Sequence, residues 1–216
     1  DNEHYAQATQ FLIREDYYKQ VADELVDHLS QDLAGYQLHI GVPAANRKAI
    51  GYFSQKDFKC IESSFDTRLC GLGARPNQQN DCIAQITASN FEKYAVFHDK
   101  YAIPNEMYYH SGNLKKDLER FRILAFRHGG AIRGSIFVKV FKDGAEVFGL
   151  FIDQEQKNNG LERALINEIL ARLYHEFGAL GEIVYFIEEN STDELDCALV
   201  SGFEIRDHYR CFRRTL

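Results

Sequence analysis

One passage of the sequence combines features that bind anions, and it covers residues 145–170, AEVFGLFIDQEQKNNGLERALINEIL. An apolar strand leads through a polar turn that contains Gly160 directly into an amphipathic helix. The first N–H groups of a helix have no partner within the helix, and the helix dipole places partial positive charge at the same end. The passage therefore predicts an anion site at the start of this helix, beside the positive charge of Lys157.

A second passage, YFIEENSTDELDCALVSGFEIRDHY, covers residues 185–209. Its pattern is an apolar strand, Asn190, a short helix, the pair Gly202-Phe203 and a final strand. The continuous apolar run IVYFI at residues 183–187 is typical of a strand that is buried on both faces. This passage thus predicts a second strand and helix close behind the anion site.

Together the two passages resemble the acetyl-CoA-binding half of GNAT-type (GCN5-related) N-acetyltransferases, from about Ala145 to Phe212. In that family the loop usually reads Arg or Gln, two residues, Gly, one residue, then Gly or Ala. Residues 157–162 stand at these positions, and Glu162 departs from the pattern by adding bulk and negative charge. The resemblance implies acetyl-CoA as cosubstrate, with its pantetheine arm in a gap between two splayed strands. The residues that would bind it are Phe151, Ile152, Lys157, Asn158, Asn159, Gly160, Leu161, Glu162 and Asn190.

Acyl transfer to an amine needs a base for the amine and a proton for the leaving thiolate. Glu146 lies on the strand that enters the loop, where the resembling enzymes often carry a carboxylate, and Glu188 ends the next strand. The family's usual acid, a Tyr, falls at Cys197 or Ala198, so Tyr209 on the last strand is the substitute candidate. Either Glu could instead be a surface carboxylate. The predicted catalytic residues are Glu146, Glu188 and Tyr209, and the choice of base stays open.

Periodicity predicts the elements that must position these residues. Helices are expected at residues 16–34, 46–58, 90–102, 113–127 and 161–177, with strands at 59–69 and 204–216 and a hairpin turned by Lys142-Asp143-Gly144. The predicted fold class is α/β (α+β), with a mixed, mostly antiparallel GNAT-like sheet flanked by helices. A smaller, partial GNAT-like N-terminal unit is expected beside it.

The polar, turn-rich stretch CGLGARPNQQNDC, residues 70–82, is the best linker candidate in the chain. We expect a partial GNAT-like unit at 1–72 (helix, strand, helix, strand), a linker at 73–82 and a GNAT-like acyl-CoA-binding domain at 83–216. Asn46, Tyr52 and Phe53 repeat the family's closing pattern. The chain is therefore interpreted as a tandem arrangement with an incomplete first copy.

The formal charge of -7 and the pI of about 5.6 oppose binding to nucleic acid and to anionic membranes. No apolar run approaches the roughly 20 residues that cross a bilayer, and the first residues do not resemble a signal peptide. The eight His and five Cys show no metal-ligand spacing. These features predict a cytoplasmic, metal-free protein whose partners are neutral or cationic.

The functional prediction is an acyl-CoA-dependent N-acyltransferase that acetylates an amine of a small molecule or a peptide. The alternative is a catalytically silent GNAT-like module that binds CoA weakly or not at all, which the unusual Glu162 and the absent Tyr favour. A homodimer is possible, because an incomplete first unit leaves a sheet edge to be covered.

Overall fold

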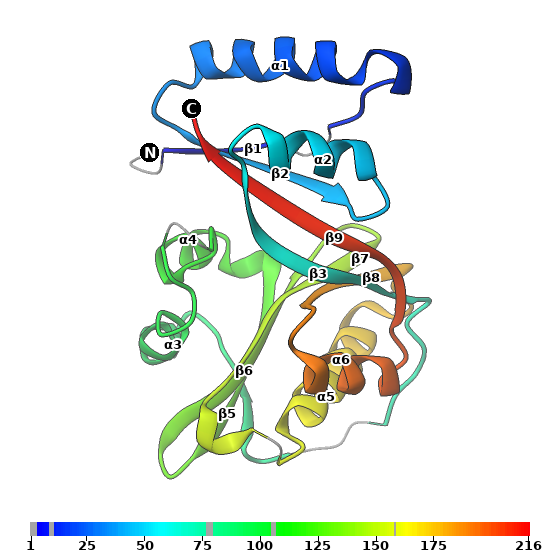
Figure 1. Cartoon of the computed structure of the whole chain (residues 1–216). Helices are drawn as coiled ribbons and strands as arrows, with labels where there is room; N and C mark the ends of the chain where they lie inside the picture. Colours follow the sequence, from blue (N-terminus) through cyan, green and yellow to red (C-terminus); the bar gives the residue numbers. More distant parts are fainter. Residues whose placement is uncertain (1–3, 9–10, 77–79, 105–106, 158) are drawn as a thin grey trace. The chain divides into compact units, whose positions relative to one another are not determined.

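The structure, a computed structural model, describes residues 4–8, 11–76, 80–104, 107–157 and 159–216. Two compact units make up the chain: the first is Asp1–Asp66 with Arg206–Leu216, and the second is Thr67–Ile205. Among the described residues, nine strands follow the order β1-β2-β9-β3-β8-β7-β6-β5-β4 (Figure 1). The chain is thus an α/β protein with a mixed sheet, and β3 and β9 contribute residues to both units.

The first unit alternates strands and helices. Its elements are β1 (Tyr5–Ala8), the 3-10 turn η1 (Glu15–Tyr17), α1 (Tyr18–Asp32), β2 (Gln37–Pro43), α2 (Arg47–Gln55), the first part of β3 (Lys59–Cys70) and most of β9 (Glu204–Thr215). Strand β1 runs parallel to β2, and β2 runs antiparallel to β9. Leu38, Ile40 and Val42 alternate along β2 and are buried, as expected of a strand with one face against helices.

Aromatic rings fill the core of the first unit. The fully buried ring of Phe53 on α2 lies about 5 Å between centroids from Phe11, Phe58 and Phe212. Burying one such side chain contributes about 2–3 kcal/mol. Because Phe212 comes from the end of the chain, this core forms only when β9 has joined β2.

The second unit contains the remaining elements. They are β4 (Ile83–Gln85), α3 (Phe91–His98), α4 (Ser111–Lys116), η2 (Leu118–Arg120), β5 (Phe121–His128), β6 (Ala131–Val140), β7 (Gly144–Ile152), η3 (Gln154–Gln156), α5 (Leu161–Phe177), β8 (Glu182–Glu188) and α6 (Thr192–Val200). Strands β4 to β7 are antiparallel neighbours, and β8 runs parallel to β7. Helices α5 and α6 lie on one side of these strands and α3 and α4 on the other (Figure 1).

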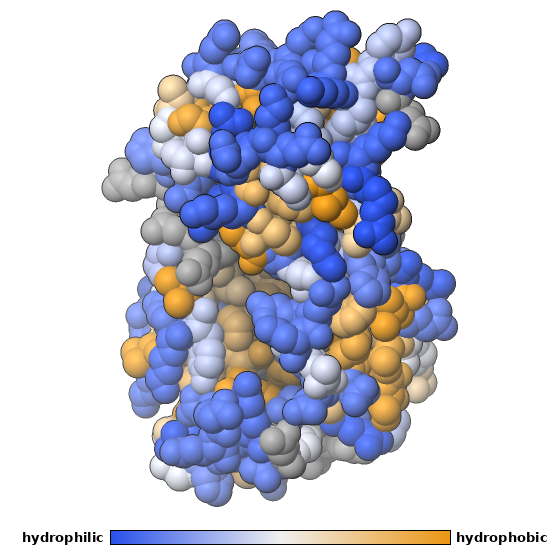
Figure 2. Space-filling view, viewed as in Figure 1, coloured by the Kyte–Doolittle hydropathy of each residue, from blue (hydrophilic) through white to orange (hydrophobic). Residues whose placement is uncertain are grey.

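Each face of this sheet has its own apolar core. Leu165, Ile169 and Leu173 of α5 pack on one face with alternate residues of β6, β7 and β8. Phe137 and Phe151 belong to the core on the other face, under α3. On the outside, apolar residues gather over α5 and α6 (Figure 2), where Leu199 and Val200 are exposed. No helix of the described residues could span a membrane.

Most predicted elements are present, and one range was misassigned. The helix at 161–177 and the hairpin at Lys142-Asp143-Gly144 are confirmed. The predicted helix at 113–127 is wrong, because only Ser111–Lys116 is α-helical and Phe121–His128 is strand β5. Strand β5 is buried on both faces, with Ile123 in one core and Leu124 in the other, so its sequence lacks the alternation that marks a half-buried strand.

The partial N-terminal unit is not found as a separate body. The first 66 residues form a compact unit only together with Arg206–Leu216, whose strand supplies the partner of β2. Within these residues β1 covers only one edge of β2, and its other edge needs β9, which lies between β2 and β3. Residues 73–76 and 80–82 of the predicted linker lie in the second unit, and 77–79 lie outside the described residues. The division at 73–82 stays a prediction.

Candidate functional site

The loop between β7 and α5 presents the start of a long helix. Gly160 caps α5 with φ of 74°, a left-handed conformation that favours glycine. The Ala164 N–H donates to the Gly160 carbonyl, so the N–H groups of Leu161, Glu162 and Arg163 precede the helix's own hydrogen-bond ladder. This end of α5 is the predicted anion site, and Asn158 within it lies outside the described residues.

Asp153 fixes the beginning of this loop. The Tyr101 hydroxyl donates to Asp153 Oδ1 at 2.7 Å, and Arg133 donates to Oδ2 at 3.1 Å. Burial raises the pKa of the Asp153 carboxyl, but these hydrogen bonds outweigh it and hold the pKa below its ordinary value. The loop therefore leaves β7 in a defined direction.

Strands β7 and β8 separate just before the loop. Their parallel pairing runs from Gly144 with Glu182 to Val147 with Tyr185, whereas β7 continues to Ile152 and β8 to Glu188. The pairing of β6 with β7 shifts register between Phe137 and Val138 of β6, which leaves Phe148 of β7 as an extra residue. This shift marks the point of separation. Bulges of this kind bend a strand and increase its twist. The splay that the resemblance implies is thus present, and beyond it the two strands do not pair with each other.

Of the two predicted contact residues on β7, only one side chain is partly exposed. Ile152 is buried in the α5 core, so its backbone alone is available to a ligand. The Phe151 ring points to the opposite face, where it stacks on Tyr101 with centroids 5.1 Å apart. Asn190 is exposed in the turn after β8. Lys157 precedes Gly160 and follows η3.

Carboxylates line the start of α5 on the side of α6. Glu162 is 8% exposed, and its charge acts on Glu194 and Cys197 of α6. Burial raises the pKa of the Cys197 thiol, and Glu162 raises it further. The Glu162 side chain is therefore turned toward α6 rather than toward solvent. A carboxylate in this place repels an anion at the helix start and opposes the helix dipole's attraction for it.

Glu194 is a functional candidate that sequence reasoning missed. The fully buried Tyr185 hydroxyl of β8 donates to Glu194 Oε1. Burial, together with the charges of Glu188 and Glu162, raises the pKa of the Glu194 carboxyl to about 7, so it exchanges a proton near neutral pH. Glu194 lies about one helical turn before Cys197 and Ala198, the two positions where the family's Tyr is expected, and that spacing is its signal in the sequence.

The predicted catalytic residues do not all gather at one place. Glu146 lies one residue before the strands separate, and Glu188 is exposed at the end of β8. Tyr209 belongs to the first unit, where its ring covers Gly41 of β2 so closely that a methyl group added there would collide with it. The catalytic role of Tyr209 stays a prediction, and its position in the structure is explained by packing.

A buried lysine marks the face of the sheet under α3 and α4. Lys139 of β6, 7% exposed, donates to the Tyr109 hydroxyl and to Asp117 Oδ2, the latter at 3.1 Å. Its ammonium hydrogen bond lowers the pKa of the Asp117 carboxyl. Glu146 is the ladder partner of Lys139, and paired residues point to the same face. Glu146 therefore belongs to this second face, opposite the α5 core.

The same face holds a neutral histidine. His98 Nε2 lies 2.7 Å from the Tyr109 carbonyl oxygen, which only accepts, so Nε2 carries the proton. Nδ1 then accepts from the Tyr94 hydroxyl at 2.9 Å. Burial lowers the pKa of His98, which keeps the ring uncharged between Phe137 and Phe151. His98 thus has all its hydrogen-bonding positions filled and acts as part of the core.

The fold is similar to solved structures of acetyltransferases. A GCN5-related N-acetyltransferase from Sphaerobacter thermophilus matches with a TM-score of 0.68 at 12% identity, over 94% of this chain and 70% of that one. A tandem GNAT protein from the clavulanic acid biosynthesis pathway matches with a TM-score of 0.65 at 12% identity, over 99% of this chain and 76% of that one. A GCN5-related N-acetyltransferase from Kribbella flavida matches with a TM-score of 0.63 at 8% identity, over 97% of this chain and 80% of that one.

Comparison of the amino-acid sequence with family models and with curated proteins finds no match. No protein-family model matches the sequence. No curated protein matches it either. The structural similarity, together with the splayed strands and the loop before α5, shows that this chain has the GNAT fold. Identities of 8–12% establish the fold alone.

Proposed function

We propose that the second unit is an acyl-CoA-dependent N-acyltransferase that transfers an acetyl group from acetyl-CoA to an amine. The separation of β7 and β8 directly before the Gly160 cap carries this proposal. An extended arm that contains amides can pair with strand backbone at the separation, and its diphosphate can then meet the N–H groups at the start of α5. Lys157 supplies a positive charge beside that position.

The reaction joins the amine nitrogen to the thioester carbonyl carbon and breaks the carbon–sulfur bond. The amine loses a proton to Glu146 or Glu188, directly or through water, and the departing thiolate takes up a proton. Glu194 is a candidate donor of that proton within the second unit, because the pKa of its carboxyl is about 7. The acceptor is an amine of a small molecule or a peptide, and the face that holds Glu146 is its proposed position.

Binding and turnover are tested separately. Acetyl-CoA is titrated into the full chain by calorimetry, and thiol release is followed with a panel of amines. We expect Lys157→Ala to weaken acetyl-CoA binding about threefold to tenfold, since one exposed charge is worth about 1 kcal/mol. Lys142→Ala, an exposed lysine on the hairpin turn, is the matched control and should change nothing. Absence of any acetyl-CoA binding would refute the proposal.

The base is identified by comparing Glu146→Gln with Glu188→Gln. Loss of the general base is expected to lower kcat about 100-fold while KM changes little. The exposed Glu92, which pairs with Lys115 on the surface, gives the control Glu92→Gln. If neither variant lowers kcat, neither carboxylate is the base.

A second candidate function is a silent GNAT-fold module that acts through binding. The carboxylates of Glu162 and Glu194 at the proposed diphosphate position favour it. The exposed Leu199 and Val200 on α6 offer an apolar contact for a partner or a second copy. Acetyl-CoA binding without turnover on any amine would support this function over catalysis. We also propose that the first unit is an incomplete copy of the GNAT fold. Its order of helix, strand and helix supports this hypothesis.

A further inference from the structure

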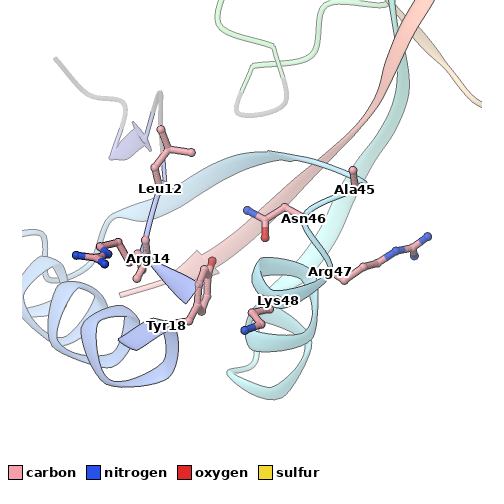
Figure 3. A pocket seen from close by; sticks show the side chains of 8 residues that line it. Leu12, Arg14, Tyr18, Ala45, Asn46, Arg47 and Lys48 are labelled. Atoms are coloured by element: carbon pink, nitrogen blue, oxygen red, sulfur yellow. The ribbon is translucent and has the colours of Figure 1, made fainter. Parts of the chain in front are cut away.

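The first unit contains a pocket that the proposed acyltransfer does not use. It has a volume of about 650 Å³ and lies between the segment before α1 and the start of α2 (Figure 3). Its lining is Leu12, Ile13, Arg14, Tyr18, Ala45, Asn46, Arg47 and Lys48. Three of these eight side chains are cationic, and none of the described lining residues carries a carboxylate. In a chain with a net charge of -7, this is a local reversal of sign.

A buried hydroxyl in this pocket lacks a partner. Tyr18 is 8% exposed, and its hydroxyl has no hydrogen bond to any described residue. Burial without a partner also raises its pKa. Figure 3 shows the hydroxyl directed into the space between Leu12 and Asn46. Buried polar groups are nearly always hydrogen-bonded, so this hydroxyl indicates a missing acceptor.

Asn46 faces the same space from α2. Its Oδ1 accepts the Ala49 N–H at 3.1 Å and caps the helix, which leaves the Nδ2 amide to donate elsewhere. In Figure 3 the amide nitrogen lies on the side of Tyr18. Two neutral donors, from different helices, are therefore directed into one pocket.

The first turn of α2 carries positive side chains, although this end of a helix favours negative ones. Arg47 and Lys48 occupy its first turn, which contains no acidic residue. Cations are disfavoured at this positive end of the helix dipole. Arg14 and Arg47 are exposed, and Figure 3 shows their side chains extending away from the pocket in opposite directions. Neither guanidinium pairs with a described residue. Flexible side chains of this length can fold over a bound anion.

From these contacts we propose that the pocket binds a phosphate-bearing small molecule. Its phosphate oxygens accept from the Tyr18 hydroxyl and the Asn46 amide at the start of α2, and the Arg14 and Arg47 side chains neutralise its charge. Several donors around one point require a ligand with several acceptor oxygens, which phosphate supplies. The apolar walls, Leu12, Ile13 and Ala45, contact the uncharged body of the ligand.

The test uses pyrophosphate as the probe and the full chain. Calorimetry gives the affinity at constant ionic strength, and amide NMR shifts locate the site, with changes expected at Asn46, Arg47 and Lys48. The double variant Arg14→Ala/Arg47→Ala is expected to weaken binding at least tenfold. Lys59→Ala, which changes an exposed lysine on β3, is the control and should leave this affinity unchanged.

Tyr18→Phe separates a ligand contact from a structural role. Without ligand, removal of an unpartnered hydroxyl should leave the melting temperature equal or higher. With pyrophosphate, the same variant should bind about tenfold more weakly and show a smaller thermal shift. Unchanged affinity in both Tyr18→Phe and the double variant would overturn the proposal, as would shifts confined to residues 157–163. Citrate bound as tightly as pyrophosphate would overturn the assignment to phosphate.

Discussion

The starts of helices α5 and α2 make the most informative comparison in this protein. Each follows a strand and a short turn. At α5 no side chain caps the first N–H groups, whereas at α2 the Arg47 N–H donates to the Ala45 carbonyl and the Ala49 N–H to Asn46 Oδ1. At α5 the neighbouring side chains are the carboxylates of Glu162 and Glu194, with Lys157 as a counter-charge. At α2 they are Arg47 and Lys48, with an unpartnered tyrosine hydroxyl across the pocket.

The difference shows that backbone geometry and side-chain charge give separate information. The loop before α5 has the spacing of a family motif, which led the sequence interpretation to that helix alone. The charges favour an anion at α2 instead. An anion site needs hydrogen-bond donors, from the helix end or from side chains, and a local field of the right sign. The helix with the recognisable motif has the less favourable field, and experiments on charge can test this contrast.

The largest expected effect comes from the carboxylate that makes the α5 side acidic. The pKa of Glu194 rises from 4.5 to about 7 in the folded protein, so folding favours its protonated form. Its contribution to stability is complete below pH 4.5 and is lost as the pH rises to about 7. The loss is up to about 3 kcal/mol. Unfolding of Glu194→Gln, followed from pH 4.5 to 8, should show a smaller decline than the parent protein.

The control for Glu194→Gln is Glu92→Gln, which changes an exposed carboxylate on α3. The control should keep the parent's pH dependence. An identical decline in the parent and in Glu194→Gln would contradict the raised pKa and would weaken the contrast between the two helix starts.

A smaller effect is expected from the carboxylate in the first turn of α5. Glu162→Gln removes a buried negative charge beside the proposed diphosphate position, so acetyl-CoA affinity should rise about tenfold, which is about 1.4 kcal/mol. Glu155→Gln changes an exposed carboxylate in the same loop, whose charge is screened by solvent and by Arg133 3.8 Å away. Calorimetry on both variants measures the difference. Equal affinities would show that Glu162 does not obstruct the site.

The architecture of the second unit was largely predictable from the sequence. The period of α5, with Leu165, Ile169 and Leu173 on one face, and the Asp-Gly turn before β7 are local signals that need no tertiary information. Strand β5 was missed because burial on both faces removes the alternation on which strand assignment depends. The pairing of β2 with β9 was missed because β9 lies about 170 residues later in the chain, and pairing at that distance leaves no local pattern.

For the candidate sites too, features with a local signal were predictable from the sequence, and features that depend on tertiary contacts were not. Gly160 and the junction before α5 were found from spacing, and the structure gives that glycine the left-handed conformation that only a Gly adopts easily. Glu194 could not be found, because its raised pKa depends on burial and on the charges of Glu188 and Glu162 from other elements. The Tyr18 pocket depends on an absent hydrogen bond, and a sequence does not show absences of that kind.

The smallest expected effects come from one substitution made in both units. Gly160→Ala should destabilise the protein by about 1 kcal/mol, because an L side chain at φ of 74° is strained although no atom lies within 4 Å of its Cβ. Gly51 lies inside α2, also with free space around an added Cβ, so Gly51→Ala should stabilise it by about 0.5–1 kcal/mol. Denaturant unfolding of both variants measures these opposite signs. A Gly160→Ala variant as stable as the parent protein would show that the loop before α5 is not held in the conformation that presents its N–H groups.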